Sequence, residues 1–176
     1  MTDSTLRSLF GPVGQIGYVV HDLEAAARTW FDTTGIGPWR IMPHVPLDHF
    51  TYEGTPTPID FGMATAYTGD VQIELIAQHD DNPSMYLELL DTFGEGAQHV
   101  CFYPTDYDAA LGAALDAGMA VAQEGSLAGI RFAYLRGTDG VVIELGDLPD
   151  AVREGRARAV AEARDWDGTD PIRIRG

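Results

Sequence analysis

Alternating apolar and polar residues, interrupted by stretches with helical spacing, divide this chain into two similar halves. In the first half, alternation and β-branched residues predict strands at residues 15–20, 39–42, 61–67 and 71–77. In the second half, the same pattern predicts strands at residues 99–103, 119–123, 130–135 and 140–145. Each first strand is followed by an aspartate and an Ala-rich apolar stretch, which predicts a capped helix at residues 23–31 and 107–117. The order strand, helix, three strands therefore occurs twice.

Individual polar residues repeat along with the elements. Gln15 opens the first half where His99 opens the second, and Asp22 corresponds to Asp106. Near the end of each half, a Glu stands within an apolar strand: Glu74 and Glu144. Polar residues at equivalent positions of a repeat are stronger evidence for a shared role than any single one of them would be.

Strand side chains point alternately to the two faces of a sheet, so parity assigns each residue to a face. The apolar set that we expect beneath the helices is Ile16, Tyr18, Ile73, Leu75, Val100, Phe102, Ile143 and Leu145. The opposite face, which we expect to be concave, carries Gln15, Glu74, His99 and Glu144.

These four residues have the composition of a metal site. A carboxylate in an apolar strand is costly unless it is paired, protonated or bound to a metal. Three oxygen donors and one imidazole suit a divalent ion that keeps positions open for water or substrate. The alternative is that each residue simply faces solvent on an open sheet, and the repeat favours the metal site.

Composition excludes several classes of function. The formal net charge of -16 argues against a nucleic-acid or anionic-membrane surface. All eleven basic residues are arginine, so Schiff-base chemistry on lysine is excluded. The single cysteine, Cys101, allows no intrachain disulfide, and we interpret it as a small buried hydrophobe. Without a signal-peptide pattern or an apolar run of membrane-spanning length, we expect a cytoplasmic protein.

The pattern predicts one α+β domain, residues 1–147, with module one at about 14–78 and module two at about 97–147. Residues 1–13 are expected to be a short lead-in, and residues 148–176 a surface or interface helix with a polar, extended tail. Residues 43–60, here called the long excursion, could bring His44 or His49 to the site, since loops often carry function. His21 and His79 are expected to be solvated. Exposed sheet edges and the C-terminal helix favour a homodimer.

Four motifs resemble the vicinal oxygen chelate superfamily, which includes glyoxalases, methylmalonyl-CoA epimerases, extradiol dioxygenases and bleomycin-resistance proteins. The motifs are Gln15-Ile-Gly-Tyr-Val-Val-His-Asp-Leu, Val71-Gln-Ile-Glu-Leu, Gln98-His-Val-Cys-Phe and Val141-Val-Ile-Glu-Leu. The resemblance implies two βαβββ modules forming a half-open barrel around one divalent metal ion: Zn, Ni, Co, Mn, Mg or Fe. It places the ligands at Gln15, Glu74, His99 and Glu144.

The first ligand position separates branches of that superfamily. Epimerases and dioxygenases usually have histidine where this chain has Gln15, so the ligand set looks more like some glyoxalase I enzymes. The two-histidine, one-carboxylate iron site of a ring-cleaving dioxygenase lacks a histidine here. The glutathione-binding arginines of glyoxalase I have no counterpart that we can place, and the pair of modules in one chain looks closer to the epimerases.

Two functions follow from this resemblance. The first is a metal-dependent enzyme that moves a proton next to a carbonyl of a small oxygenated substrate, as an epimerase, isomerase or glyoxalase-like lyase. Glu144 is the first candidate for the base and Glu74 the second. The alternative is a small-molecule binding or resistance protein of the same fold without catalysis.

Overall fold

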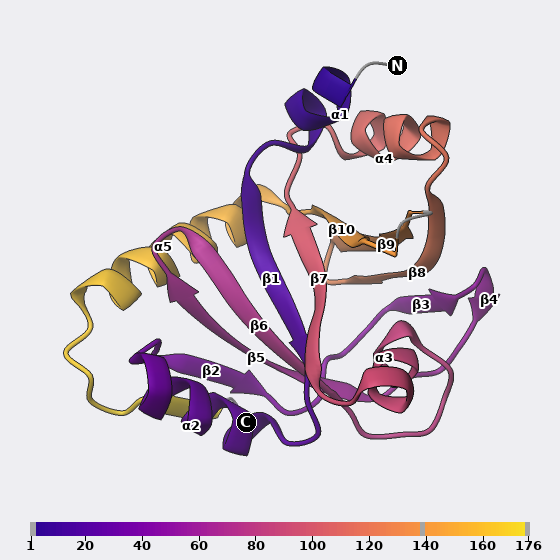
Figure 1. The fold of residues 1–176 in the computed structure, drawn as a ribbon. Coiled ribbons are helices and arrows are strands. Elements are labelled where there is room, and N and C mark those ends of the chain that lie inside the picture. The colour runs from indigo at the N-terminus through magenta and orange to yellow at the C-terminus, as the bar shows by residue number, and fades with distance from the viewer. Residues whose placement is uncertain (1–2, 138–139, 175–176) are drawn as a thin grey trace.

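The computed structural model describes residues 3–137 and 140–174; residues 1–2, 138–139 and 175–176 lie outside the described part. Its strands form one curled sheet of eleven strands in the order β11-β2-β5-β6-β1-β7-β10-β9-β8-β3-β4 (Figure 1). The helices lie around this sheet. The predicted α+β class is thereby confirmed.

Both βαβββ modules are present. Module one comprises β1 (Val13–Val19), α2 (Leu23–Thr34), β2 (Trp39–Met42), β5 (Phe61–Thr68) and β6 (Val71–Gln78). Module two comprises β7 (Gly96–Phe102), α4 (Tyr107–Asp116), β8 (Ala120–Leu127), β9 (Ile130–Arg136) and β10 (Val142–Asp147). In each module the first strand pairs in parallel with the last, β1 with β6 and β7 with β10.

The modules meet where β1 pairs antiparallel with β7 at the centre of the sheet (Figure 1). This junction brings the two first strands, and through them the two last strands, into one neighbourhood. Equivalent residues of the repeat therefore converge on the middle of the concave face.

Local chemistry explains the helices of the repeat. Asp22 accepts a hydrogen bond from the Ala25 amide, and Asp106 accepts one from the Ala109 amide, so both predicted caps are formed. Gly35 then ends α2 with a left-handed φ of 72°. The two helices cover the face that parity assigns to them: Ile73 and Leu75 pack in the cluster under α2, and Leu145 packs in the cluster under α4.

Four segments add to the repeat. The expected lead-in contains a helix, α1 (Asp3–Phe10), which the sequence pattern had not predicted. Apolar residues at helical spacing, Leu6, Leu9 and Phe10, pack this helix against the cluster beside α4. The linker helix α3 (Met85–Phe93) buries Met85 and Tyr86 in the core of the concave face.

The long excursion also contains structure that the alternation did not predict. Its β3 (His49–Tyr52) pairs with β8 of module two, and β4 (Thr55–Pro56) pairs with β3. The C-terminal segment forms α5 (Asp150–Asp165) and β11 (Ile172–Ile174), which extends module one beside β2. The excursion of module one thus extends the sheet of module two. Within the described ranges, no helix combines the length and the apolar character needed to cross a membrane.

Candidate metal centre

A cavity of about 200 Å³ lies on the concave face of the sheet. Both modules line it, and its wall is mostly apolar and aromatic, with Phe61 and Ile76 on one side and Phe132 and Tyr134 on the other. Gln15, Glu74 and Glu144 are the polar residues from the predicted set that reach it. A few polar groups converging in an apolar cavity are typical of a small-molecule site.

Three of the predicted ligands come together beside this cavity. Glu74 and Glu144 are 7% and 8% exposed, and His99 is 3% exposed. The His99 Nε2 atom lies 2.9 Å from Glu144 Oε2 and 3.7 Å from Glu74 Oε2. One ligand atom from each of these residues falls within 4.8 Å of the other two, which is close enough for all three to bind one ion. Parity had assigned them to one face, and the β1–β7 junction makes them neighbours.

The orientation of His99 suits a metal ligand. Its Nδ1 lies 2.6 Å from Gln98 Oε1, an acceptor, so Nδ1 carries the proton of the neutral ring and Nε2 keeps its lone pair. Metal-bound histidines ordinarily hold their second ring nitrogen in this way. The ring also packs edge-on against Tyr134, with centroids 4.9 Å apart.

Unsatisfied buried atoms support the fit of an ion. Among the described residues, the buried side-chain atoms without a hydrogen-bond partner include His99 Nε2 and Glu144 Oε2. These two atoms lie 2.9 Å apart, close enough for a proton or a metal ion to be held between them. Buried polar atoms are rarely left without a partner, and a shared cation would satisfy both. The donor set, carboxylates with one neutral imidazole, therefore fits a divalent metal.

Burial and neighbouring charges determine the protonation of the site in the absence of metal. Burial, followed by the charge of Glu144, raises the pKa of Glu74 to about 7, against smaller opposing effects of His99 and Arg156. Burial alone would lower the pKa of His99, but the nearby Glu144 and Glu74 raise it above its usual value. The metal-free cluster therefore holds protons near neutral pH that an ion would displace.

Gln15 is buried on β1 and lines the same cavity. Its Nε2 donates to Gln72 Oε1 at 2.9 Å. Because the amide nitrogen points to Gln72, the amide oxygen is the atom that Gln15 can offer to an ion. Its role as the fourth ligand stays a prediction.

The main residue that our sequence analysis missed is Arg156 on α5. Its guanidinium donates to Gln72 Oε1 at 2.7 Å, to the Tyr103 hydroxyl at 3.2 Å and to the Gly14 carbonyl at 3.0 Å. It also lies over the Tyr103 ring, 4.2 Å from the centroid. The predicted surface helix therefore reaches the cavity as well. The sequence signal that could have revealed Arg156 is a four-residue spacing. Leu148, Val152 and Arg156 follow one another at this spacing, and all three line the cavity.

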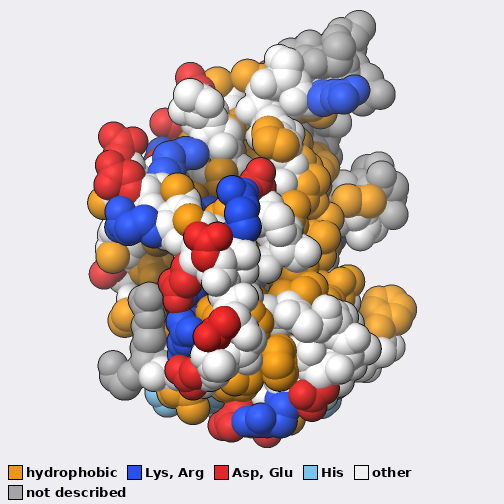
Figure 2. Space-filling view, turned by 90° about the vertical axis from the view of Figure 1, so that its left-hand side faces the viewer, with side chains coloured by type: hydrophobic (Ala, Val, Ile, Leu, Met, Phe, Trp, Pro, Cys, Tyr) orange, Lys and Arg blue, Asp and Glu red, His pale blue; other side chains and the backbone are white. Residues whose placement is uncertain are grey.

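The outer face of α5 matches the expectation of a surface helix. Figure 2 views the molecule from the left-hand side of Figure 1, where α5 lies, and acidic and basic side chains are interspersed over this face. No residue of α5 is fully buried. One face of α5 covers the cavity, and its other faces are exposed to solvent.

Cys101, His44 and His49, which the sequence also offered as candidates, do not line the cavity. Cys101 is buried and free, and its burial raises its pKa well above the usual value, as expected of a small hydrophobe. His49 is exposed on β3, and His44 is exposed outside the cavity. The long excursion instead supplies an apolar wall residue, Val45.

Glycines make room for this arrangement. Gly17 on β1 lies directly across from His99, and a Cβ at Gly17 would come within 1.9 Å of the His99 ring. We predict that Gly17→Ala displaces the imidazole, weakens Zn²⁺ binding at least about 10-fold and costs about 1–3 kcal/mol of stability. Gly96→Ala is the matched control, because a Cβ there meets nothing within 4 Å. Calorimetric Zn²⁺ titration of both variants checks this; unchanged binding in Gly17→Ala would contradict the placement of His99.

Comparison with known proteins identifies the family of the chain. The model of the Glyoxalase/Bleomycin resistance protein/Dioxygenase superfamily matches residues 14–134. The chain belongs to this superfamily. No curated protein sequence matches the chain significantly.

Solved structures share the vicinal oxygen chelate fold with this superfamily member. Methylmalonyl-CoA epimerase from Mycobacterium tuberculosis superimposes with a TM-score of 0.58 at 23% identity, covering 83% of this chain and 93% of that one. A variant of the Streptomyces coelicolor methylmalonyl-CoA epimerase, in complex with 2-nitronate-propionyl-CoA, gives 0.55 at 24% identity, covering 78% and 97%. A hypothetical protein, BH1468 from Bacillus halodurans C-125, gives 0.58 at 15% identity, covering 79% and 95%. At these identities the likeness establishes the fold alone.

Proposed function

We propose that this protein is a metal-dependent enzyme that transfers a proton at the carbon next to a carbonyl of a small, anionic substrate. The observation that carries the proposal is the buried Glu74–His99–Glu144 cluster, which opens on an apolar cavity. His99, Glu74 and Glu144 would hold the ion, with Gln15 as the fourth ligand. A divalent ion there would polarise the substrate carbonyl, which makes the neighbouring proton more acidic.

The two carboxylates suit proton removal and return. Glu74 comes from β6 of module one and Glu144 from β10 of module two, so they reach the cavity from different strands. Each carboxylate has two oxygens, and one can hold the ion while the other handles a proton. We assign Glu144 as the base. Glu74 is the second carboxylate that reaches the cavity, and we assign it as the group that returns the proton.

Arg156 and the size of the cavity define the substrate class. The hydrogen bonds of Arg156 within the described ranges go to neutral acceptors, and its charge also acts on the neighbouring Glu74. Its positive charge is thus available to a substrate carboxylate or to the oxygen that gains charge during proton transfer. At about 200 Å³, the cavity is smaller than the usual site for a drug-sized ligand. We therefore favour small 2-substituted oxo or thioester acids over substrates with a large body buried inside.

A catalytically inactive binding protein is the second candidate, because the superfamily includes resistance proteins and the cavity is mainly apolar. Retention of all the predicted ligands argues against it. Whether the chemistry is that of an epimerase, another isomerase or a lyase is left to the experiment. A ring-cleaving dioxygenase is less favoured because the cluster has one histidine. The homodimer and the cytoplasmic location stay predictions.

Deuterium exchange tests the proposal directly. Protein loaded with Zn²⁺, Ni²⁺, Co²⁺ or Mn²⁺ is incubated in D₂O with methylmalonyl-CoA and a panel of small 2-substituted oxo acids and 2-hydroxy ketones. Mass spectrometry and proton NMR should show metal-dependent deuterium at the carbon next to the carbonyl. Tight binding of these compounds without any exchange, and no stoichiometric metal, would favour the binding protein.

The pH dependence of the metal-free protein gives a second prediction. The unfolded chain releases the Glu74 proton near pH 4.5, whereas the folded metal-free protein keeps it to about pH 7. Unfolding therefore releases a proton in this window, so stability falls as the pH rises from 4.5 to 7, by up to about 3 kcal/mol. The raised pKa of His99 acts in the same direction, because its stabilising effect is also lost with rising pH.

Denaturant titration of chelator-treated protein between pH 5 and 8 checks this prediction. Glu74→Gln should flatten the dependence, since glutamine does not titrate. Added Zn²⁺ should stabilise the wild type most at the high end, where fewer protons compete with the ion. Rising stability between pH 5 and 7 in the metal-free wild type would contradict the assignment.

A further inference from the structure

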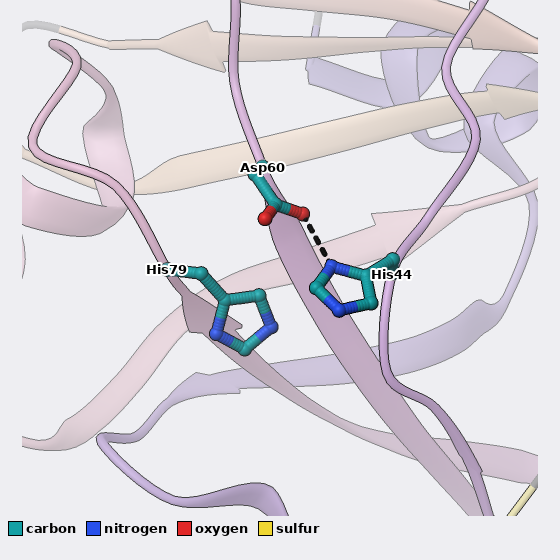
Figure 3. Close-up of side chains that lie close together, drawn as sticks. All are labelled: His44, Asp60 and His79. Carbon is teal, nitrogen blue, oxygen red and sulfur yellow. Dashed lines mark hydrogen bonds and ion pairs between the residues drawn. The ribbon is translucent and has the colours of Figure 1, made fainter.

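A second group of ligand-type side chains lies on the outside of the protein, formed by His44, Asp60 and His79 (Figure 3). His44 follows β2, Asp60 immediately precedes β5, and His79 immediately follows β6. One ligand atom from each lies within 4.8 Å of the other two. The His44 Nδ1 atom is 2.7 Å from Asp60 Oδ1, and the two imidazole rings have centroids 5.1 Å apart. Three segments distant in sequence therefore present nitrogen and oxygen donors to one point.

Main-chain hydrogen bonds hold these segments in place. The His79 amide donates to the Asp60 carbonyl at 2.8 Å, and the Val45 amide donates to the Phe61 carbonyl at 2.8 Å. The Asp60 amide donates in turn to the carboxylate of Asp80. The backbone segments that carry the three donor residues are thus fixed to one another. This lowers the entropic cost of ordering the donors when an ion binds.

The tautomer of His79 leaves one ring nitrogen free to bind a metal ion. Its Nε2 lies 2.8 Å from the Pro43 carbonyl oxygen, which can only accept, so Nε2 carries the proton. In the neutral ring, Nδ1 then keeps its lone pair as a ligand atom. A histidine that donates its other ring proton to a backbone carbonyl is the common arrangement around bound metals.

We propose that His44, Asp60 and His79 form a second divalent metal site, selective for zinc-like ions that favour imidazole. Two nitrogens and one carboxylate oxygen suit Zn²⁺, Co²⁺ or Ni²⁺, with water in the remaining positions. Water has access, because the side chains of His44 and Asp60 are 70% and 49% exposed. The formal net charge of -16 attracts cations to the protein as a whole.

Two ligands of the outer site are next in sequence to residues of the cavity wall. His44 is followed by Val45, and Asp60 is followed by Phe61, and both apolar residues line the cavity. An ion that joins His44 to Asp60 would fix the two segments that carry this part of the wall. The proposal does not depend on any catalytic activity of the inner cluster.

Zinc stoichiometry of the full-length protein tests the proposal. Chelator-treated wild type, His44→Ala/His79→Ala and His99→Ala are titrated with Zn²⁺ at about pH 7.5 by calorimetry, and bound metal is counted by mass spectrometry after equilibrium dialysis. The double variant should bind one Zn²⁺ fewer per chain than the wild type. His99→Ala should keep the outer ion, which separates the two sites even if the inner cluster binds no metal. His21→Ala/His49→Ala is the matched control, since both histidines are exposed and lie outside the cluster.

Two further measurements guard against misfolding and unspecific binding. Metal-free wild type and double variant should unfold at the same denaturant concentration. Added Zn²⁺ should protect the long excursion from proteolysis in the wild type, in His99→Ala and in the matched control, but not in the double variant. A large excess of Mg²⁺ should not displace this Zn²⁺, because magnesium prefers oxygen ligands. Equal Zn²⁺ stoichiometry in the wild type and the double variant would overturn the proposal, and so would complete displacement by Mg²⁺.

Discussion

Glu144→Gln is expected to lower the rate of deuterium exchange by about 10²- to 10⁴-fold, because proton transfer needs the carboxylate and an amide cannot take up the proton. Glutamine keeps an oxygen donor and nearly the same volume but loses the negative charge. Zn²⁺ should therefore bind at least about 10-fold more weakly and still reach full occupancy at high concentration. The measurement compares exchange and metal content at saturating Zn²⁺, using the most active compound of the substrate panel.

Glu144→Ala and Glu74→Gln complete this experiment. The alanine variant should lose both metal and exchange. Folding should survive, because the repulsion between Glu144 and Glu74 is relieved in the metal-free protein. In Glu74→Gln, exchange should also fall at saturating Zn²⁺, since one of the two carboxylates available for proton transfer has been removed. A Glu144→Gln protein with full metal and unchanged exchange would leave Glu144 as a replaceable ligand and remove it as the base.

Arg156→Met is expected to raise the KM for anionic substrates by about 10- to 100-fold, the usual loss when a charged hydrogen-bond donor is removed. Methionine keeps much of the apolar length of the side chain, so the wall of the cavity should be retained. Neutral esters of the same substrates should lose far less, since they do not pair with the guanidinium. Steady-state kinetics on each acid and its ester provide the measurement.

Arg153→Met is the matched control for this charge. Arg153 lies on the same helix and donates to the carbonyls of Leu148 and Pro104. Its side chain does not line the cavity, so its removal disturbs α5 without changing the cavity wall. Equal effects of the two variants would mean that Arg156 acts only by holding the helix in place. Equal losses for acid and ester would likewise remove Arg156 as the anion contact.

Much of the fold followed from strand periodicity and the repeat. The strands and helices of both modules, the two aspartate caps and the assignment of Glu74, His99 and Glu144 to one face could all be predicted. These features are local or repeated, and a strand turns its side chains to alternate faces wherever it lies in a sheet. Two additions to the repeat, α1 and the strands of the long excursion, were not predicted from the sequence. The helix α1 was missed because its apolar residues are few and become informative only once the neighbouring surface of α4 is known.

The sequence by itself thus determined which face each strand residue occupies, and with it the set of residues available for a metal centre. Only the tertiary structure decided that β3 of the long excursion crosses to module two, that α5 brings Arg156 to the cavity, and that His44 meets Asp60 and His79 on the outside. The physical reason is range. Alternation along a strand is set by neighbouring peptide units, whereas the positions of an excursion and a terminal helix depend on packing between segments far apart in the chain.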